Sequence, residues 1–200
     1  MEAPILETQR LIMRPFSHTD VSEFVEELTS QCDIMANLSE ECAAPSEQER
    51  CAILYIEDYS SSWQTHHYGG WAVCARTSEI ADPGKLLGFC GFAPGLLEGA
   101  GAELAFAYGR SYWGKGIGTE AASACIRWFF DVGGHDRCYV SHHSWNEASR
   151  KIIEAIGFVY YRDEDLWGSV EKGDGLLPTY LLDRESYLNH GQPAQSLSQP

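Results

Sequence analysis

The sequence of 200 residues has no long apolar run, few basic residues and no closely spaced cysteine pair. No stretch approaches the roughly 18 to 20 consecutive apolar residues that a membrane-spanning helix needs. The opening segment, MEAPILETQR, has an early acidic residue and lacks the basic and then apolar pattern of a secretory signal peptide. We therefore expect a cytoplasmic protein that does not enter a membrane.

Basic side chains are scarce, since 14 Lys and Arg residues stand against 29 Asp and Glu residues, for a formal net charge of −15. Nucleic acids and anionic membranes are bound through neutralising Lys and Arg side chains, so this balance excludes both as expected partners. The same charge would attract a cationic substrate such as an amine. An acidic surface that serves only solubility explains the charge equally well, so the charge excludes partners without identifying one.

The cysteines lack the spacing of a metal site or of a redox pair. An odd number of cysteines, spread widely in a chain without an export signal, predicts free thiols, several of them buried as small hydrophobic side chains. Because metal ligands recur at short, regular spacing, we expect no bound metal. The seven cysteines are Cys32, Cys42, Cys51, Cys74, Cys90, Cys125 and Cys138.

The rest of the composition is that of a globular domain, with 44% apolar and 22% charged residues. The first segments predict a strand that ends at Pro15, a helix that opens at Thr19 or Asp20, and a second helix behind a capping box of Ser46 and Glu49. Three short antiparallel strands follow, separated by turn signals, over 71–76, 85–94 and 102–109.

The second half of the chain alternates strands and helices, and the whole order is that of a mixed α/β domain. We expect this domain to span residues 1–187, and the polar tail 188–200 to be disordered. The later elements are predicted as helices over 119–134 and 146–156 and strands over 136–143, 157–163 and 178–184.

The stretch YWGKGIGTEA, from Tyr112 to Ala121, places three glycines at alternate positions where a helix is about to begin. Glycine lets backbone N–H groups turn toward an anion and lets a diphosphate approach without a Cβ in the way. The helix N-terminus would add unpaired amides and the positive end of its dipole. The spacing matches neither a Walker A loop nor a G-x-G-x-x-G dinucleotide motif, and by itself a plain turn explains it as well.

The same stretch, followed about thirty residues later by NEASRKIIEAIGF, resembles the acyl-CoA signature of the GNAT N-acetyltransferases. Within that superfamily the chain is most similar to the RimJ/RimL type, the ribosomal-protein alanine N-acetyltransferases, whose first strand and helix the segment LETQRLIMRPFSHTDVSEF also resembles. The resemblance covers roughly residues 5 to 185. It implies the GNAT fold, in which a mixed, mostly antiparallel central sheet is flanked by helices and splayed at the acyl-CoA site.

The resemblance also implies an activity and a coenzyme site. The activity is acetyl transfer from acetyl-CoA, without a metal, directly to the primary amine of a protein N-terminus or of a small molecule. Backbone amides of the glycine stretch would hold the diphosphate, while main-chain groups on the preceding strand and one Asn side chain would contact the pantetheine arm. The implied cofactor-binding residues are Phe106, Tyr108, Trp113, Gly114, Lys115, Gly116, Ile117, Gly118, Thr119 and Asn146.

Two positions depart from the family pattern. Trp113 stands where the usual residue is Gln or Arg, and Ile153 stands seven residues after Asn146, where many members carry a general-acid Tyr. The group that donates a proton to the leaving thiolate is therefore not identified by the family pattern. A non-catalytic acyl-CoA-binding or sensing module remains the alternative to an enzyme.

Two other side chains are candidates for the chemistry of acetyl transfer. Glu103, on the strand expected to border the acyl group, could take the proton of the acceptor ammonium or bind the cation. Ser149, one turn after Asn146 on the same helix face, could protonate the thiolate or hydrogen-bond its sulfur. His142 and His143 end a nearby strand, and alternation predicts that at most one of them faces the site. Unpaired strand edges in such a fold are compatible with a homodimer.

Overall fold

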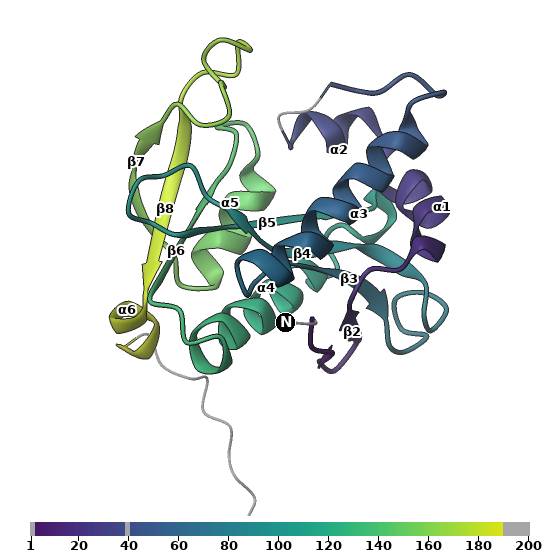
Figure 1. The fold of residues 1–200 in the computed structure, drawn as a ribbon, viewed down its shortest axis with the longest axis horizontal. Coiled ribbons are helices and arrows are strands. Elements are labelled where there is room, and N and C mark those ends of the chain that lie inside the picture. The colour runs from purple at the N-terminus through teal and green to yellow at the C-terminus, as the bar shows by residue number, and fades with distance from the viewer. Residues whose placement is uncertain (1–2, 39–40, 190–200) are drawn as a thin grey trace, which may run out of the picture.

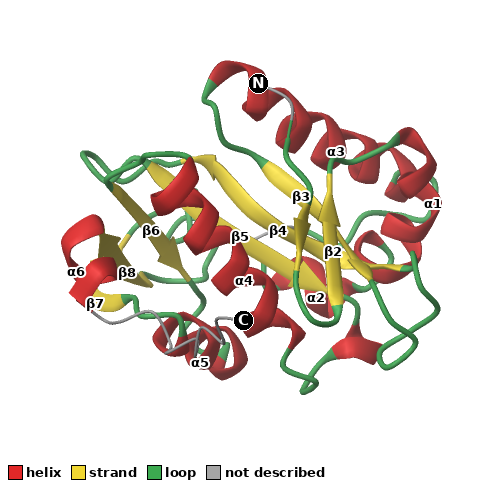
Figure 2. Cartoon of the chain, turned by 90° about the horizontal axis from the view of Figure 1, so that it is seen from below, coloured by secondary structure: helices red, strands yellow, loops and turns green. Residues whose placement is uncertain are grey.

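The structure is a computed structural model that describes residues 3–38 and 41–189. These residues form an eight-stranded sheet in the order β1-β2-β3-β4-β5-β6-β8-β7, with helices on both faces (Figures 1 and 2). Among its neighbouring strands, only β5 and β6 are parallel. The expected mixed, mostly antiparallel sheet is therefore confirmed.

The strands are β1 (Leu6–Glu7), β2 (Leu11–Arg14), β3 (Gly70–Ala75), β4 (Leu86–Pro94), β5 (Ala102–Tyr108), β6 (Arg137–Ser141), β7 (Val159–Glu164) and β8 (Leu177–Asp183). The helices are α1 (Val21–Phe24), α2 (Cys32–Ala36), α3 (Gln48–Thr65), α4 (Ile117–Arg127), α5 (Glu147–Ala155) and α6 (Arg184–Asn189). A 3₁₀ turn precedes α1, and π-helical turns extend α1 and α4, over His18–Asp20, Val25–Thr29 and Trp128–Val132.

The first strand differs from the prediction, because two short strands stand in place of one. β1 and β2 pair as a hairpin, and the Thr8 N–H donates to the Leu11 carbonyl oxygen across the turn (3.0 Å). The Thr8 hydroxyl and the Arg10 N–H both donate to the carboxylate of Glu120 in α4. This long-range anchor explains why the chain turns where the sequence pattern alone continues as a strand.

The helix caps also differ from the prediction. Ser17 caps the 3₁₀ turn, and Asp20 completes that capping box by accepting from the Ser17 N–H. Asp20, one of the two predicted residues, is the cap position of α1, but its side chain makes no capping bond to that helix. The predicted box of Ser46 and Glu49 does not form, since the cap position of α3 is Glu47, which makes no side-chain capping bond. Asp20 is held by the guanidinium of Arg14, whereas Ser46 lies exposed in a turn.

Different helices cover the two faces of the sheet. α1 and α3 lie on one face, and α4 and α5 lie on the other (Figure 2). Side chains alternate along a strand, so Leu104 and Tyr108 pack in the core cluster that contains α4, whereas Ala107 packs in the cluster that contains α3. Glu103 shares the face of Ala107, and its side chain therefore lies on the α3 side of the sheet.

The sheet opens between β5 and β6. These strands stay paired through two residue pairs, Ala102 with Cys138 and Glu103 with Tyr139. β5 then continues to Tyr108 beside β4, without a ladder partner on its β6 side. The edge of β5 after Glu103 therefore presents backbone polar groups to a wedge-shaped gap, as the splayed fold predicts.

The prediction that all seven cysteines are free is wrong for two of them. Cys32 and Cys42 form a disulfide, because the chain turns back after α2 and brings their Cα atoms to 4.7 Å. Nothing in the spacing of these two cysteines along the chain indicates this pairing. The free thiols are Cys51, which is half-buried, and the buried Cys74, Cys90, Cys125 and Cys138.

The C-terminal part ends in a helix that the sequence pattern did not predict. α6 reaches Asn189, two residues into the segment 188–200 that we expected to be disordered. Residues 190–200 of that segment lie outside the described residues. Within the described ranges, no helix combines the length and the apolar character needed to cross a bilayer.

Candidate active site

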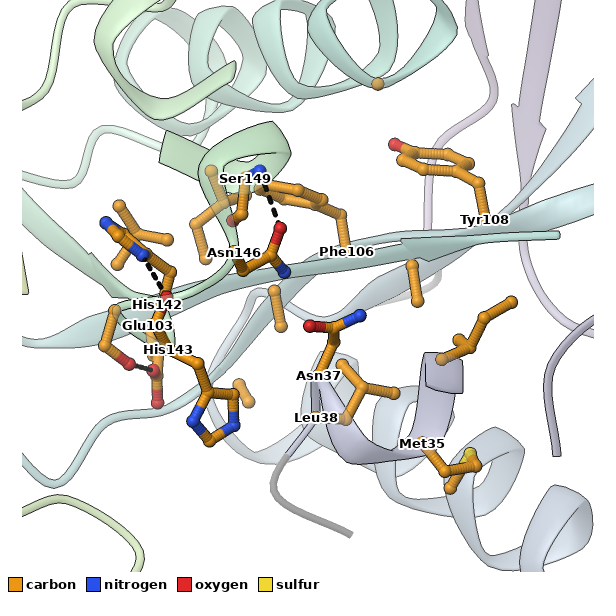
Figure 3. Close-up of a pocket in the computed structure, with 18 of the residues that line it drawn as sticks. Met35, Asn37, Leu38, Glu103, Phe106, Tyr108, His142, His143, Asn146 and Ser149 are labelled. Carbon is orange, nitrogen blue, oxygen red and sulfur yellow. Dashed lines mark hydrogen bonds between the residues drawn. The ribbon is translucent and has the colours of Figure 1, made fainter. Parts of the chain in front are cut away.

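The gap between β5 and β6 belongs to a cleft of about 1640 Å³. The end of β5, the glycine stretch and the first turns of α4 and α5 line one part of the cleft, and α2 and α3 line the other. Figure 3 shows Ser149 above the β5 ribbon, and Glu103 and His143 below it on the side of Asn37. The cleft therefore reaches both faces of the sheet.

The glycine stretch places unpaired backbone amides at the N-terminus of α4. Gly114 and Gly116 have φ angles of 73° and 76°, in the left-handed region that favours glycine. Gly116 is the N-cap of α4 and makes no side-chain capping bond. The amides of Ile117–Thr119 have no acceptor within the helix, and these residues line the cleft. Unpaired amides and the helix dipole together suit a phosphate group.

Gly118 and Lys115, also in this stretch, differ from Gly114 and Gly116 in their contacts. A Cβ on Gly118 would lie 2.7 Å from Ile152 Cδ1 and 3.3 Å from Tyr108 Cε2, so this glycine allows α4 to pack closely against α5 and β5. Lys115 is the one residue of 113–119 that does not line the cleft. Its Nζ lies 5.7 Å from the centroid of the Tyr112 ring. The Lys115 side chain therefore lies beside Tyr112, and its backbone belongs to the stretch expected to hold the diphosphate.

An ion pair between Arg10 and Glu120 holds the glycine stretch against the first hairpin. The Arg10 guanidinium donates to the Lys115 carbonyl oxygen (3.0 Å) and pairs with Glu120 in the first turn of α4 (2.7 Å). Burial opposes the charge of Glu120, but hydrogen bonds from Thr8 and Arg10 outweigh it and hold the pKa of that carboxyl below its usual range. The acidic side chain nearest the helix N-terminus is thus neutralised by Arg10.

Trp113 ties the glycine stretch to the end of β5. Its Nε1 donates to the Tyr108 carbonyl oxygen (2.7 Å), and its ring is 47% exposed. The carbonyl of Tyr108, one of the expected main-chain contacts of the pantetheine, therefore accepts one hydrogen bond within the protein and keeps a second lone pair. The main-chain groups near Phe106 remain on the open edge of β5, where the contact stays a prediction.

Glu103 is a buried carboxylate, 7% exposed, with three hydrogen-bond donors. The Ser141 hydroxyl donates to Oε1 (2.8 Å), while the Tyr139 hydroxyl (3.1 Å) and Trp167 Nε1 (3.0 Å) donate to Oε2. Burial raises the pKa of Glu103, and the hydrogen bonds offset that rise only in part. A carboxylate with increased proton affinity suits binding of an ammonium group and acceptance of its proton.

Trp167 was missed by the sequence reasoning. It lies in the segment between β7 and β8, far along the chain from Glu103, and nothing in the local sequence pattern indicates that contact. Its φ of 58° is in the left-handed region, which is uncommon for a residue other than glycine. The available signal was an exposed Trp in an acidic, glycine-bearing segment, which is not specific.

Asn146 and Ser149 lie together at the start of α5, as predicted. Asn146 Oδ1 accepts from the Ser149 N–H (3.0 Å) and caps the helix. Its Nδ2 group then remains to donate to a ligand in the cleft. Ile153 is fully buried in the core, so the position of the family's Tyr faces packing partners here and carries no acid.

Both His142 and His143 line the cleft, which corrects the expectation that at most one of them would. β6 ends at Ser141, so strand alternation no longer applies to the two residues. His142 Nδ1 lies 2.7 Å from the His143 carbonyl oxygen, and we assign the ring proton to Nδ1 because a carbonyl only accepts. The His143 ring stacks on Trp145 and hydrogen-bonds to the backbone of Ala36 in α2, while burial lowers its pKa.

The family described as Acetyltransferase (GNAT) domain matches residues 10–159, which run from the turn before β2 to the start of β7. The chain belongs to the GNAT acetyltransferase family. Membership establishes this domain as an acetyltransferase of the family that uses acetyl-CoA, and it agrees with the sheet order and with the opening between β5 and β6. No cluster of three or more His, Cys, Asp or Glu side chains within 3–38 and 41–189 could hold a metal.

Relatives and solved structures extend this assignment. The Bacillus licheniformis protein named "Uncharacterized N-acetyltransferase p20" is 30% identical over 142 residues, which are 69% of this chain and 74% of that protein. The Bacillus anthracis GNAT acetyltransferase structure is 19% identical, with a TM-score of 0.71 over 91% of this chain and 99% of that one. The ribosomal-protein-S5-alanine acetyltransferase of Vibrio fischeri is 14% identical, with a TM-score of 0.69 over 92% and 99%. The two structures share the GNAT fold with this chain.

Proposed function

We propose that this GNAT domain transfers the acetyl group of acetyl-CoA to the primary amine of a cationic acceptor, directly and without a covalent enzyme intermediate. The observation that carries the proposal is the opening between β5 and β6. It joins the unpaired amides at the α4 N-terminus to a buried carboxylate, Glu103, on the opposite face of the sheet. These are the two polar groups that a coenzyme diphosphate and an ammonium ion would need.

The coenzyme side of the proposal uses backbone groups and one amide side chain. The amides from Gly114 to Thr119 would hold the diphosphate, and the open edge of β5 near Phe106 would pair with the pantetheine arm. Asn146 Nδ2 would donate to the same arm, since Oδ1 is committed to the helix cap. The left-handed φ angles of Gly114 and Gly116 and their place in the lining of the cleft support this fit.

The leaving thiolate would be stabilised at the N-terminus of α5. The Ser149 hydroxyl and the positive end of the helix dipole both favour a developing negative charge. A serine hydroxyl is a weak acid, so Ser149 would act by hydrogen-bonding the sulfur more than by giving up its proton. This arrangement explains how transfer can proceed although Ile153 replaces the Tyr of many relatives.

The acceptor side of the cleft favours a cation. Asp33, Glu41 and Asp58 line the wall from α2 to α3, and Asp33 is paired with Arg110, so Glu41 and Asp58 supply the negative charge there. Among the described lining residues, the lysines are Lys151 and Lys172, and both lie outside this wall. Glu103 would bind the ammonium group and accept its proton. The similarity to the RimJ/RimL type makes a protein N-terminal alanine the first acceptor to test, and a small polyamine is the second.

Calorimetric titration tests the coenzyme part of the proposal. We expect micromolar binding of acetyl-CoA and of desulfo-CoA, and much weaker binding of ATP, because the pantetheine arm should contribute to affinity. Thiol release should then appear only when an amine is added, with a basic peptide that begins with alanine and a polyamine as the two arms. Absence of binding at millimolar acetyl-CoA would contradict the proposed function.

The buried Ile153 also supports a second candidate, a module that binds acyl-CoA without catalysis. Such a module predicts tight coenzyme binding together with slow deacylation that no amine accelerates. The thiol-release measurement therefore separates the two functions directly.

A further inference from the structure

The segment between β7 and β8 lines the cleft with two residues, Trp167 and Lys172, and Trp167 also contacts Glu103. Trp167 Nε1 donates to Glu103 Oε2 at 3.0 Å, and the two residues are 64 positions apart. The Trp167 ring lines the cleft and is 42% exposed. This residue therefore touches both the buried carboxylate and the space that an acceptor would occupy.

The segment holds Trp167 in place through its own contacts. Leu166 is 4% exposed and packs in a small core cluster with Tyr139. On the other side of Trp167, the Ser169 hydroxyl and the Val170 N–H both donate to Asp165 Oδ1. These contacts fix the backbone on both sides of Trp167, whose left-handed conformation would otherwise be unfavourable.

The three donors to Glu103 differ in their origin. Tyr139 and Ser141 belong to β6, which is paired with β8, and Tyr139 is fully buried. Trp167 comes from a connecting segment and has the most exposed side chain of the three. The groups that lower the pKa of Glu103 are these three uncharged donors. The negative charge of Glu103 therefore depends on hydrogen bonds, one of which lies at the mouth of the acceptor site.

We propose that Trp167 is a positioning residue for acetyl transfer: its indole N–H holds the ionised Glu103 carboxylate toward the acceptor, and its exposed ring forms a wall of the acceptor pocket. The proposal rests on the proposed function, because it assigns Glu103 to the amine. The indole N–H lies in the plane of the ring, so the ring face stays available to an alkylammonium group. The acceptor that fits is therefore a primary amine on a flexible aliphatic chain or peptide backbone, bound between the ring face and the carboxylate.

The pH dependence of the reaction reports on this contact. The titratable groups around Glu103 are Tyr139 on β6, Tyr59 on α3 and the two histidines after β6, while β4 places Ala93 opposite it. Lys172, from the same segment as Trp167, lines the same cleft. Burial raises the pKa of both phenols, so they stay neutral in the working range. Loss of the indole N–H would raise the pKa of Glu103, because that hydrogen bond favours the ionised form.

The test is Trp167→Phe, which keeps an aromatic ring and removes the donor. We expect the acidic limb of kcat/KM for the amine to move to higher pH by about one unit. The KM for the amine should rise about tenfold, as for the loss of one hydrogen bond to a charged group. The Kd for acetyl-CoA should not change, because Trp167 lies on the acceptor side.

Two further variants assign the effect. Trp145→Phe makes the same change on another exposed Trp of this cleft, which stacks on His143 and has no hydrogen bond to Glu103, and it should leave the acidic limb in place. Glu103→Gln should remove the limb, which separates Glu103 from His142 and His143. A Trp167→Phe profile that superimposes on the parent, with the same KM, would overturn the proposal while acetylation itself continues.

A failure of the proposed function gives a different result, since the parent would then acetylate no amine at all. If Trp167→Phe does not fold, the parent protein labelled with ¹⁵N-tryptophan provides the measurement. One indole N–H signal should shift as Glu103 ionises. If no indole N–H signal shifts over the pH range of the acidic limb, the proposal would also be overturned.

Discussion

The two halves of the sheet differ in burial and in what they carry. β3 is buried along its whole length and β4 along most of it, whereas β7 is exposed at every residue but the last. The halves meet through the two residue pairs between β5 and β6. Most of the packed core therefore lies in β1–β5 with their helices, while the second half supplies Asn146, Ser149 and Trp167.

The difference follows from position in the sheet. β3 and β4 lie between α3 on one face and α4 on the other (Figure 2), so both sets of side chains find apolar partners. β7 is an edge strand that pairs with β8 alone, and its end carries Arg162, Asp163 and Glu164. Such an edge tolerates variation because it buries little. Position in the sheet thus decides burial, and substitutions in a central strand and in this edge strand should have different effects on stability.

The largest expected contrast is between Phe92→Ala in β4 and Tyr161→Ala in β7. Phe92 is fully buried and stacks on Phe129 with ring centroids 4.2 Å apart, so its truncation should lower the free energy of unfolding by about 3–5 kcal/mol. Tyr161 is 46% exposed, and its truncation should cost about 0.5 kcal/mol or less. Urea denaturation measures both. Similar losses in the two variants would contradict the division between the halves.

An intermediate effect is expected at Glu120, which ties α4 to the first hairpin. Its folded pKa lies below the unfolded value, so its stabilising contribution is present above the unfolded pKa, roughly 4.3, and is lost as the pH falls through the folded pKa. Glu120→Gln should lower the free energy of unfolding near neutral pH by about 2 kcal/mol. The difference from the parent should shrink on acidification.

Glu103, at the junction of the halves, is the control for Glu120, because its contribution to stability should change with pH in the opposite direction. Its folded pKa is raised, so its contribution is present below the unfolded pKa and is lost as the pH rises through the folded value. Glu103→Gln should therefore cost less near neutral pH than in acid. Urea denaturation from acidic to neutral pH measures both variants, and parallel profiles would show that the two carboxyls do not differ in this way.

The left-handed glycines should change stability less than Phe92 does, and they test binding of the coenzyme. Gly116→Asp and Gly84→Asp place the same side chain at φ angles of 76° and 93°, and each should cost about 1–2 kcal/mol. Gly84 lies in the turn between β3 and β4, where a Cβ meets no atom within 4 Å. Only Gly116→Asp should abolish binding of acetyl-CoA in calorimetric titration. Equal affinity of the two variants would remove the glycine stretch from the coenzyme site.

The features that the sequence predicted well are those that depend on neighbouring residues. The three strands β3, β4 and β5, the helices α4 and α5, and the conformation of Gly114 and Gly116 all follow from local pattern. The glycine stretch was therefore found, although Gly118 proved to serve helix packing against Ile152. Local pattern also gave a wrong prediction, the capping box of Ser46 and Glu49. The capping box that does form, at Ser17, is supported by the ion pair of Asp20 with Arg14.

The features that the sequence did not predict depend on how distant segments meet. The hydrogen bond from Trp167 to Glu103 and the disulfide between Cys32 and Cys42 both require the chain to fold back before the partners come together. Neither residue type nor spacing identifies such a partner in one sequence. The acceptor side of the site consists largely of contacts of this kind, which is why its wall could be described only from the structure.

The cleft that reaches both faces of the sheet has a consequence for the order of events in turnover. Under the proposed function, the coenzyme approaches β5 from the side of α4 and α5, and the amine approaches from the side of α2 and α3. Neither molecule then blocks the entrance of the other. The first to arrive can be either one, and the acetylated product can depart while the spent coenzyme is still bound.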